Sequence, residues 1–211
     1  MKHNLVITIG RESGSAGRHI GQLLANDLGV KCYDKELLTL AAKHSGLCEE
    51  LFKSHDEKPT NSFLYSLIMD SYSVGYSGGG YLDMPLNQKV FLAQFDAIKK
   101  LAEEESCVIV GRCADVILKD YHPLNLFVYA DKEAKIERCL RRAPAGEKLT
   151  RGDIERRMRQ IDRGRAQYRE MYADSKWGAK ETYHLCISTT EKYIKEIIPG
   201  LAAYVRCWFS E

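Results

Sequence analysis

This chain of 211 residues lacks the features that mark several common protein classes. It has no run of roughly 18 apolar residues, the length that a membrane-spanning helix needs. None of its seven cysteines lies at the C-x2-C spacing of zinc and redox motifs, and no internal repeat or low-complexity tail is present. These absences argue against a helical membrane protein, a cysteine-based zinc or redox site and a repeat protein.

The cysteines and the first apolar run both suit a cytoplasmic protein. Cys107 and Cys186 stand inside apolar runs, where a reduced cysteine acts as a small apolar side chain. The first apolar run, residues 5–9, is too short for a secretion signal and leads directly into glycine-rich sequence. We therefore expect a cytoplasmic protein with no membrane partner.

Charge is nearly balanced over the whole chain but not within it. The formal net charge is +2, from 31 basic and 29 acidic residues, whereas residues 138–169 hold eleven Lys and Arg against four Asp and Glu. A basic block inside a near-neutral protein favours a local anionic ligand over a nucleic-acid surface. We therefore expect a small-molecule partner and no nucleic acid.

Apolar runs rich in β-branched residues alternate with helical periods along the chain. Such runs predict five strands, at residues 4–9, 30–33, 107–111, 126–130 and 184–187. Strands that are apolar throughout and separated by helices are typical of a parallel sheet covered on both faces. We therefore expect an α/β fold, with a five-stranded parallel sheet and helices on both faces.

Residues 45–86 interrupt this pattern. The segment has no sustained period and contains the glycine-rich stretch 73–80. Long irregular segments in compact domains are usually lids or binding loops. We interpret the chain as a single domain with a core of residues 1–44 and 87–211 and an insertion at about 45–86.

The segment between the first strand and the first helix is the principal candidate for phosphate binding. The strand ends at Gly10 and a helical period starts at Arg18. Parallel sheets bind ligands at the carboxyl ends of their strands, and a helix N-terminus preceded by glycines presents N–H groups to an anion. We expect phosphate contacts from Ser13, Gly14, Ser15, Ala16, Gly17, Arg18 and His19.

The loop departs from the usual phosphate-loop pattern, in which four residues separate two glycines and Lys-Ser/Thr follows. Here six residues separate Gly10 and Gly17, and Arg18 and His19 come next. A cation in the first helical turn opposes the helix dipole, so a bound polyphosphate explains Arg18 better than helix propensity does. The alternative is a plain glycine turn that joins strand to helix.

Two charged residues, Asp34 and Arg112, follow the second and third predicted strands. The carboxyl ends of parallel strands share one edge of the sheet, so both residues should lie near the loop. There they would orient a small anionic substrate. The alternative is an ion pair that only rims the sheet.

A long helix, which we expect Asp153 to cap, carries the arginines of the basic block. Arg159, Arg163 and Arg165 are candidates for neutralising charge on a transferring phosphoryl group, because guanidinium forks match phosphate oxygens. The alternative is a solvated helix face, although such faces usually mix charges of both signs.

Several stretches together resemble the cytidylate kinase-like family, a branch of the nucleoside monophosphate (NMP) kinases. They span nearly the whole chain outside residues 45–85: Ile7–Arg18, Tyr33–Glu36, Val108–Arg112 with Asp115, Asp162–Ala166, Tyr168, Trp177-Gly178 and Tyr183–Ser188. The resemblance implies an ATP:CMP phosphotransferase fold that uses ATP and Mg2+, with an NMP-binding insertion and an arginine-bearing lid at about 142–165.

The resemblance also implies which residues meet the acceptor. Asp34 would lie near the pyrimidine nucleotide, Arg112 would hold the acceptor phosphate, and Asp115 is a further substrate-binding candidate. In the family an Asp follows the Gly-Arg pair, whereas here Cys113 stands in its place.

On the donor side, Gly17 stands where bacterial cytidylate kinases carry the loop lysine, so Arg18 would have to replace that lysine. His19 occupies the place of the usual Ser/Thr ligand of magnesium, so Ser13 or Ser15 would take that role.

Three functions remain open on the sequence alone. The first is an ATP-dependent phosphotransferase that acts on CMP or dCMP. The second is a nucleotide- or phosphate-binding sensor without turnover, which the missing loop lysine favours and the set of arginines disfavours. The third is a kinase of another small molecule. The sequence leaves the oligomeric state open.

Overall fold

The computed structural model describes residues 4–45, 86–144 and 149–210. The insertion expected at about 45–86 lies outside these ranges except for its two end residues. The lid expected at about 142–165 is described on both sides of residues 145–148.

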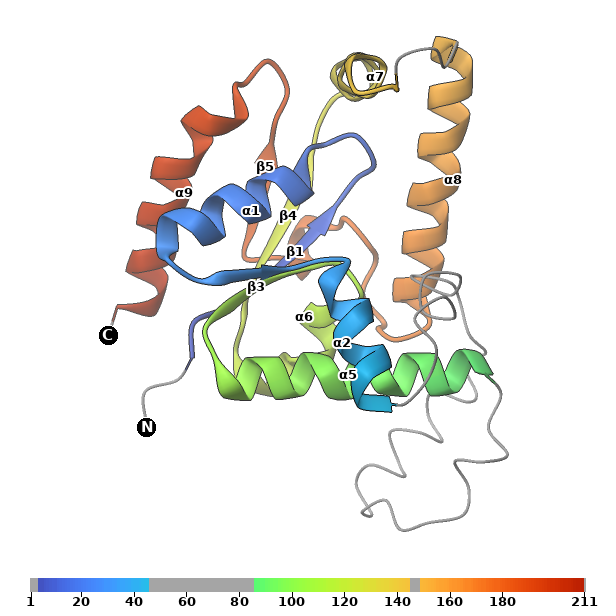
Figure 1. The fold of residues 1–211 in the computed structure, drawn as a ribbon. Helices are drawn as coiled ribbons and strands as arrows, with labels where there is room; N and C mark the ends of the chain where they lie inside the picture. The colour runs from blue at the N-terminus through green and yellow to red at the C-terminus, as the bar shows by residue number, and fades with distance from the viewer. Residues whose placement is uncertain (1–3, 46–85, 145–148, 211) are drawn as a thin grey trace.

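Five parallel strands form one sheet in the order β2-β3-β1-β4-β5 (Figure 1). The strands are β1 (Val6–Arg11), β2 (Lys31–Tyr33), β3 (Cys107–Val110), β4 (Leu124–Tyr129) and β5 (Leu185–Ser188). The expected five-stranded parallel sheet is confirmed. Because β1 is central and the chain crosses to opposite sides of it, the loop after β1 lies at the point of the sheet edge where parallel folds bind ligands.

Helices cover both faces of the sheet, as the apolar strands predict. Figure 1 shows α1 (Gly17–Leu28) beside α9 (Ile194–Phe209) on one face, and α2 (Glu36–Ser45), α5 (Leu86–Glu104) and α6 (Ala114–Ile117) on the other. The strand period of two divides the side chains of β1 between two cores. Ile7 and Ile9 are buried under α1 and α9, whereas Val6 is buried with residues of α5 and α6.

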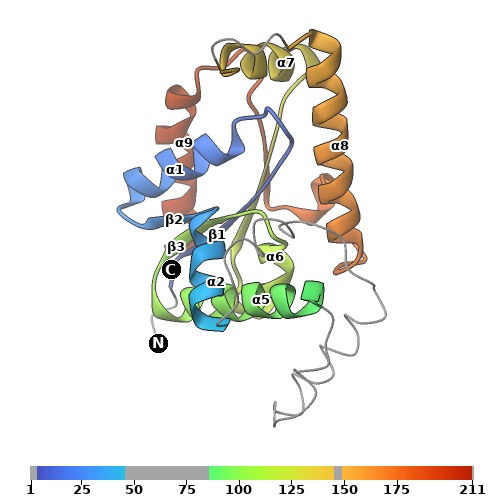
Figure 2. The same cartoon turned by 45° about the vertical axis from the view of Figure 1, so that its right-hand side comes forward.

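Two helices extend beyond the carboxyl ends of the strands. Figure 2 shows α7 (Lys132–Arg141) across this end of the molecule and α8 (Arg151–Glu170) standing alongside the sheet. They pack on each other through Ile136, Ile154 and Met158.

The start of α8 differs from the prediction that Asp153 caps it. Thr150 is the N-cap: its hydroxyl accepts from the Asp153 N–H, and the Asp153 carboxylate accepts in return from the Thr150 N–H. This reciprocal pair is a capping box, so Asp153 is the third residue of the helix. The prediction named Asp153 alone and misplaced the helix start by three residues.

The tail helix α9 begins at Ile194, and Pro199 lies inside it. Among the residues that the structure describes, no helix has both the length and the apolar character that crossing a bilayer requires.

Candidate active site

The loop between β1 and α1 is a compact turn. Gly14 and Ala16 adopt left-handed backbone conformations, with φ of 80° and 68°. The Ser15 hydroxyl donates to the Glu12 carbonyl at 2.8 Å, which draws the loop together. A Cβ added at Gly17 would lie 2.5 Å from the Arg11 Cβ, so only glycine lets the chain pass here. Such turns direct N–H groups inward and form concave anion sites.

A carboxylate from α8 already uses one of these N–H groups. The Ser13 N–H donates to Asp162 Oδ1 at 2.7 Å. Burial raises the pKa of Asp162, while the Ser13 hydrogen bond and the positive charges of Arg165 and Lys135 act in the opposite direction. The loop therefore accommodates an anion with two cations close to it.

Helix α7 and the end of β5 hold the loop from another side. Lys135 Nζ lies 2.7 Å from Glu12 Oε2. Arg138 donates to the Gly14 carbonyl at 2.7 Å and to the Thr189 carbonyl at 3.2 Å. Thr189 is fully buried, and its hydroxyl donates to the carbonyl of Ser15 at 2.9 Å.

Sequence reasoning missed these three residues, Lys135, Arg138 and Thr189. Lys135 and Arg138 are three residues apart, so they share one face of the helix that follows the fourth strand. Two basic residues at that spacing, directly after a strand end, were the signal in the sequence that could have identified Lys135 and Arg138. Thr189 offered none, because a single threonine after a strand is ordinary.

The structure brings Asp34 and Arg112 together and adds Arg18 to them. Arg18 Nε lies 2.8 Å from Asp34 Oδ2, and Arg112 Nη1 lies 3.5 Å from Asp34 Oδ1. The Arg112 side chain is 1% exposed and that of Arg18 is 48% exposed. Arg18 thus extends from the start of α1 toward the end of β2, and its guanidinium binds a carboxylate there.

A small hollow opens beside this cluster, and we call it the α8-side hollow. Its lining includes Gly10, Arg112, Asp115, Arg165, Arg169 and Tyr183. Asp115 is paired with Arg169, which is 4% exposed and stacks over the Tyr183 ring at 5.5 Å. Among the described residues, the buried Nε of Arg169 has no hydrogen-bond partner. The hollow is therefore polar and cationic, which suits an anionic ligand.

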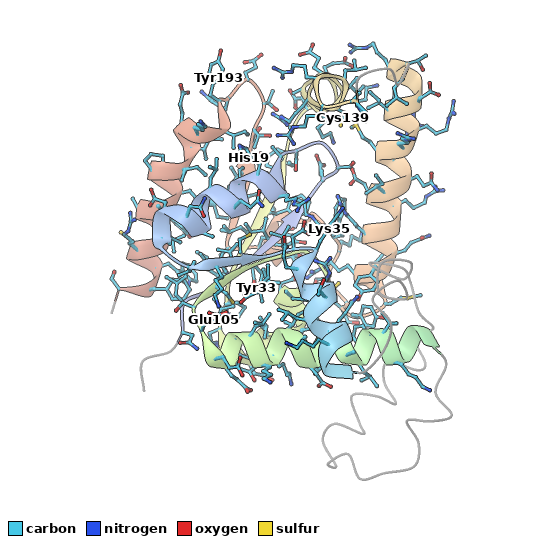
Figure 3. The ribbon with its side chains drawn as sticks, viewed as in Figure 1. His19, Tyr33, Lys35, Glu105, Cys139 and Tyr193 are labelled. Carbon is cyan, nitrogen blue, oxygen red and sulfur yellow. The ribbon has the colours of Figure 1, made fainter. Side chains whose placement is uncertain are left out.

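A wider hollow, of about 710 Å3, lies beside α7 and the start of α1, and we call it the α7-side hollow. Its lining includes His19, Arg138, Arg142, Thr190, Lys192 and Tyr193. Figure 3 shows His19 and Tyr193 at this end of the molecule, together with Cys139 of α7. Burial, and then the charges of Arg142 and Lys195, lower the pKa of His19. Arg11, the last residue of β1, lines the first hollow, and His19, in the first turn of α1, lines the second, so the two elements that flank the loop each border a hollow.

Of the three arginines expected to act from the lid, the structure directs Arg165 to the loop. Arg165 Nη1 donates to the Arg11 carbonyl at 3.2 Å. Arg159 pairs with Glu155 and its side chain is 77% exposed, and Arg163 is also exposed. The helical period explains the difference, because α8 presents only one face to the loop.

The candidate magnesium ligands differ in their surroundings. The Ser15 hydroxyl is fully buried and donates to its own loop, whereas Ser13 is partly exposed. In the part of the chain that the structure describes, no cluster of three or more His, Cys, Asp or Glu could hold a metal. Mg2+ at phosphoryl-transfer sites takes one or two protein ligands, with phosphate oxygens and waters. Ser13 therefore fits such a site better than Ser15.

The sheet order, the glycine loop between the central strand and α1, and the basic helices beyond the strand ends together define a P-loop kinase fold. The model of the cytidylate kinase-like family matches residues 6–191, so the chain belongs to that family. This confirms the resemblance seen in the sequence. Family and fold together support a P-loop phosphotransferase. No curated protein matches the chain.

Solved structures with the same fold include an uncharacterized protein from Eubacterium ventriosum. It is 28% identical, with 96% of this chain and 98% of that chain covered and a TM-score of 0.68. The shikimate kinase from Bacteroides thetaiotaomicron is 14% identical, with coverage of 96% and 98% and a TM-score of 0.54. The shikimate kinase from Acinetobacter baumannii, solved in complex with shikimate, is 12% identical, with coverage of 98% and 95% and a TM-score of 0.51. At these identities the shikimate kinases show the fold alone.

Proposed function

We propose that this protein transfers the γ-phosphoryl group of ATP to a small acceptor that already carries a phosphate, a nucleoside monophosphate such as CMP or dCMP. The observation that carries the proposal is that the two elements flanking the loop, β1 and α1, each border a hollow lined with cations. A phosphoryl transfer needs this arrangement, with the donor on one side, the acceptor on the other and positive charge where they meet.

The donor would enter from the α7-side hollow. Its phosphates would meet the N–H groups of loop residues 13–17, and its base would lie near His19, whose lowered pKa keeps the imidazole neutral at pH 7. Arg138 and Thr189 hold the loop carbonyls, so the loop N–H groups stay directed toward the anion.

The acceptor would enter the α8-side hollow. Arg112 and Arg169 would hold its phosphate, because both guanidinium groups are buried at that wall and match phosphate oxygens. Asp34 would accept from an amine or hydroxyl of the acceptor. No general base is required when the attacking group is a phosphate oxygen.

Arg165 would neutralise the group in transfer, because its guanidinium already lies at the start of the loop and lines the α8-side hollow. Mg2+ would be shared between the donor phosphates and Ser13. When bound, it offsets negative charge on the phosphate oxygens.

A second candidate function is a phosphate or nucleotide sensor without turnover. The absence of lysine from the loop and the Asp162 carboxylate on the Ser13 N–H favour it, because both weaken donor binding at the loop. A third is phosphorylation of an acceptor other than a nucleotide, since the α8-side hollow is defined by its charge and not by a base-specific contact.

The test is ADP formation from ATP and Mg2+ with a panel of nucleoside monophosphates and small alcohols. We expect one acceptor, CMP or dCMP first, to raise the rate, and Arg165→Ala to lower kcat by roughly 100-fold or more. Arg159→Ala removes an arginine from the exposed face of the same helix and should leave the rate within about twofold.

If no acceptor raises ADP formation above the Arg165→Ala level, the kinase is excluded. An ATP-dependent rise in Tm in the same samples would then support the sensor.

A further inference from the structure

The phosphate loop lacks the lysine that normally bridges the donor phosphates. Arg18 comes closest to that lysine in the sequence, but its guanidinium lies on Asp34, away from the loop N–H groups. Asp34, which lies at the end of β2 and is 7% exposed, holds Arg18 at 2.8 Å, whereas the carboxylate that pairs with Lys135, Glu12, belongs to the loop itself. The loop therefore needs its cation from elsewhere in the fold.

Helix α7 brings a lysine to the loop. Lys135 Nζ lies 2.7 Å from Glu12 Oε2, and the Lys135 side chain is 12% exposed. The backbones are also close, because a Cβ built on Gly14 would lie 3.0 Å from the Lys135 Cβ. Glycine at this position, with φ of 80°, is what allows the helix to approach.

The place of the anion is marked by Asp162. Its carboxylate accepts from the Ser13 N–H at 2.7 Å, and it lies close enough to Lys135 and Arg165 for both to lower its pKa. The Asp162 carboxylate is thus bound by a loop N–H and by Arg165 at 3.4 Å, and the charge of Lys135 acts on it as well; an N–H with nearby cations is the kind of donor set that binds a phosphate oxygen. Lys135 is one of those cations and extends from an element outside the loop.

We propose that Lys135 takes the role of the missing loop lysine and contacts the β- and γ-phosphates of the donor. The inference rests on the proposed function and names the side chain that supplies the positive charge at the donor phosphates. Glu12 holds the ammonium group in position, and the Glu12 carboxylate accepts in turn from the Ala130 N–H at 3.3 Å. A phosphate of higher charge displaces Asp162 and draws Lys135 toward it.

Titration calorimetry with ATP, ADP and adenosine tests the assignment. We expect Lys135→Met to weaken ATP and ADP binding by at least about tenfold, the typical loss when one charge-assisted contact is removed, and to leave adenosine binding unchanged. Lys135→Arg should restore most of the affinity. Lys132→Met, which removes a 58% exposed lysine from the same helix, is the matched control and should bind like the wild type.

The assignment is overturned if Lys135→Met binds ATP as tightly as the wild type, or if Arg18→Met loses more affinity than Lys135→Met does. It is also overturned if Lys135→Met loses adenosine and ATP affinity equally, because that pattern indicates a damaged fold. If the wild type binds neither ATP nor ADP, the proposed function fails and the assignment fails with it. If the wild type binds ATP and Lys135→Met binds it equally well, the assignment of Lys135 fails while the proposed function stands.

Discussion

At the scale of single residues, charged side chains at the site are held by one another. Arg18, Asp34 and Arg112 form one group, and Lys135, Glu12, Asp162 and Arg165 form another around the loop. Asp34 is buried, and Glu12 and Asp162 are partly buried, so their charges need partners, because an unpaired buried charge is costly. Substituting one member therefore removes a charge partner from another.

Asp162 gives a prediction for the dependence of stability on pH. Burial raises its pKa above the ordinary value of 3.8, so between these two values the folded state binds more protons than the unfolded state. The contribution of this group to the free energy of unfolding therefore falls as pH rises through that window. Asp162→Asn stays neutral and keeps an oxygen that can accept from the Ser13 N–H. We expect it to exceed the wild type in Tm at pH 7, by about 2–4 °C for each kcal/mol gained.

Thermal unfolding from pH 7 toward pH 4 measures the effect. The difference should shrink as the wild-type carboxyl becomes protonated, and the exposed Asp174→Asn should follow the wild type throughout. A Tm of Asp162→Asn below the wild type at pH 7 would show that the carboxylate stabilises the fold.

The sequence identified where these residues gather but not how they pair. Strand ends placed Asp34 and Arg112 at one edge, since parallel strands share their direction. Arg18 was assigned to phosphate because its position in α1 opposes the helix dipole, and nothing in the sequence reveals that its side chain reaches Asp34. Lys135 was missed because its partner, Glu12, is distant in sequence and the two meet only through packing.

At the scale of elements, the loop and α8 set opposite demands on glycine. In the loop, Gly17 faces the Arg11 side chain with no room for a Cβ. In α8, a Cβ on Gly164 would meet nothing within 4 Å. A methyl group should lower the free energy of unfolding in the crowded turn and raise it on the open helix face. Substitution by alanine therefore distinguishes the two positions.

We expect Gly17→Ala to lower the free energy of unfolding by about 1–3 kcal/mol, since Arg11 and the loop must shift. Gly164→Ala should raise it by about 0.5–1 kcal/mol through its higher helix propensity. Urea unfolding of both variants measures these values. Equal effects of the two substitutions would mean that the loop is looser than its geometry indicates.

The elements themselves were largely predictable. All five strands were identified, because each is a short apolar run next to a turn signal. The start of α8 was misplaced, since both Thr150 and Asp153 are good caps and only the backbone shows which residue is outside the helix. The orientation of the arginines on α8 required the packing of Ile154 and Met158, which fixes the face that meets the loop.

At the scale of the whole molecule, the order of the sheet explains where the chemistry lies. β1 is central in the sheet and ends at the α8-side hollow, and α1 begins at the α7-side hollow; α8 brings basic residues to the first hollow and α7 to the second. Alternation of strands and helices predicted the fold class. It could not predict the approach of α7 to the loop, because that contact depends on helix packing beyond the sheet.

The most direct test of donor binding at the loop is a crystal structure with Mg2+ and a non-hydrolysable ATP analogue. We expect the phosphates to lie against the N–H groups of residues 13–17, with Lys135 Nζ in contact with the β- and γ-phosphates. The base should lie in the α7-side hollow near His19. Phosphates bound instead at the Arg18–Asp34 pair, or an analogue bound away from the loop, would contradict this placement.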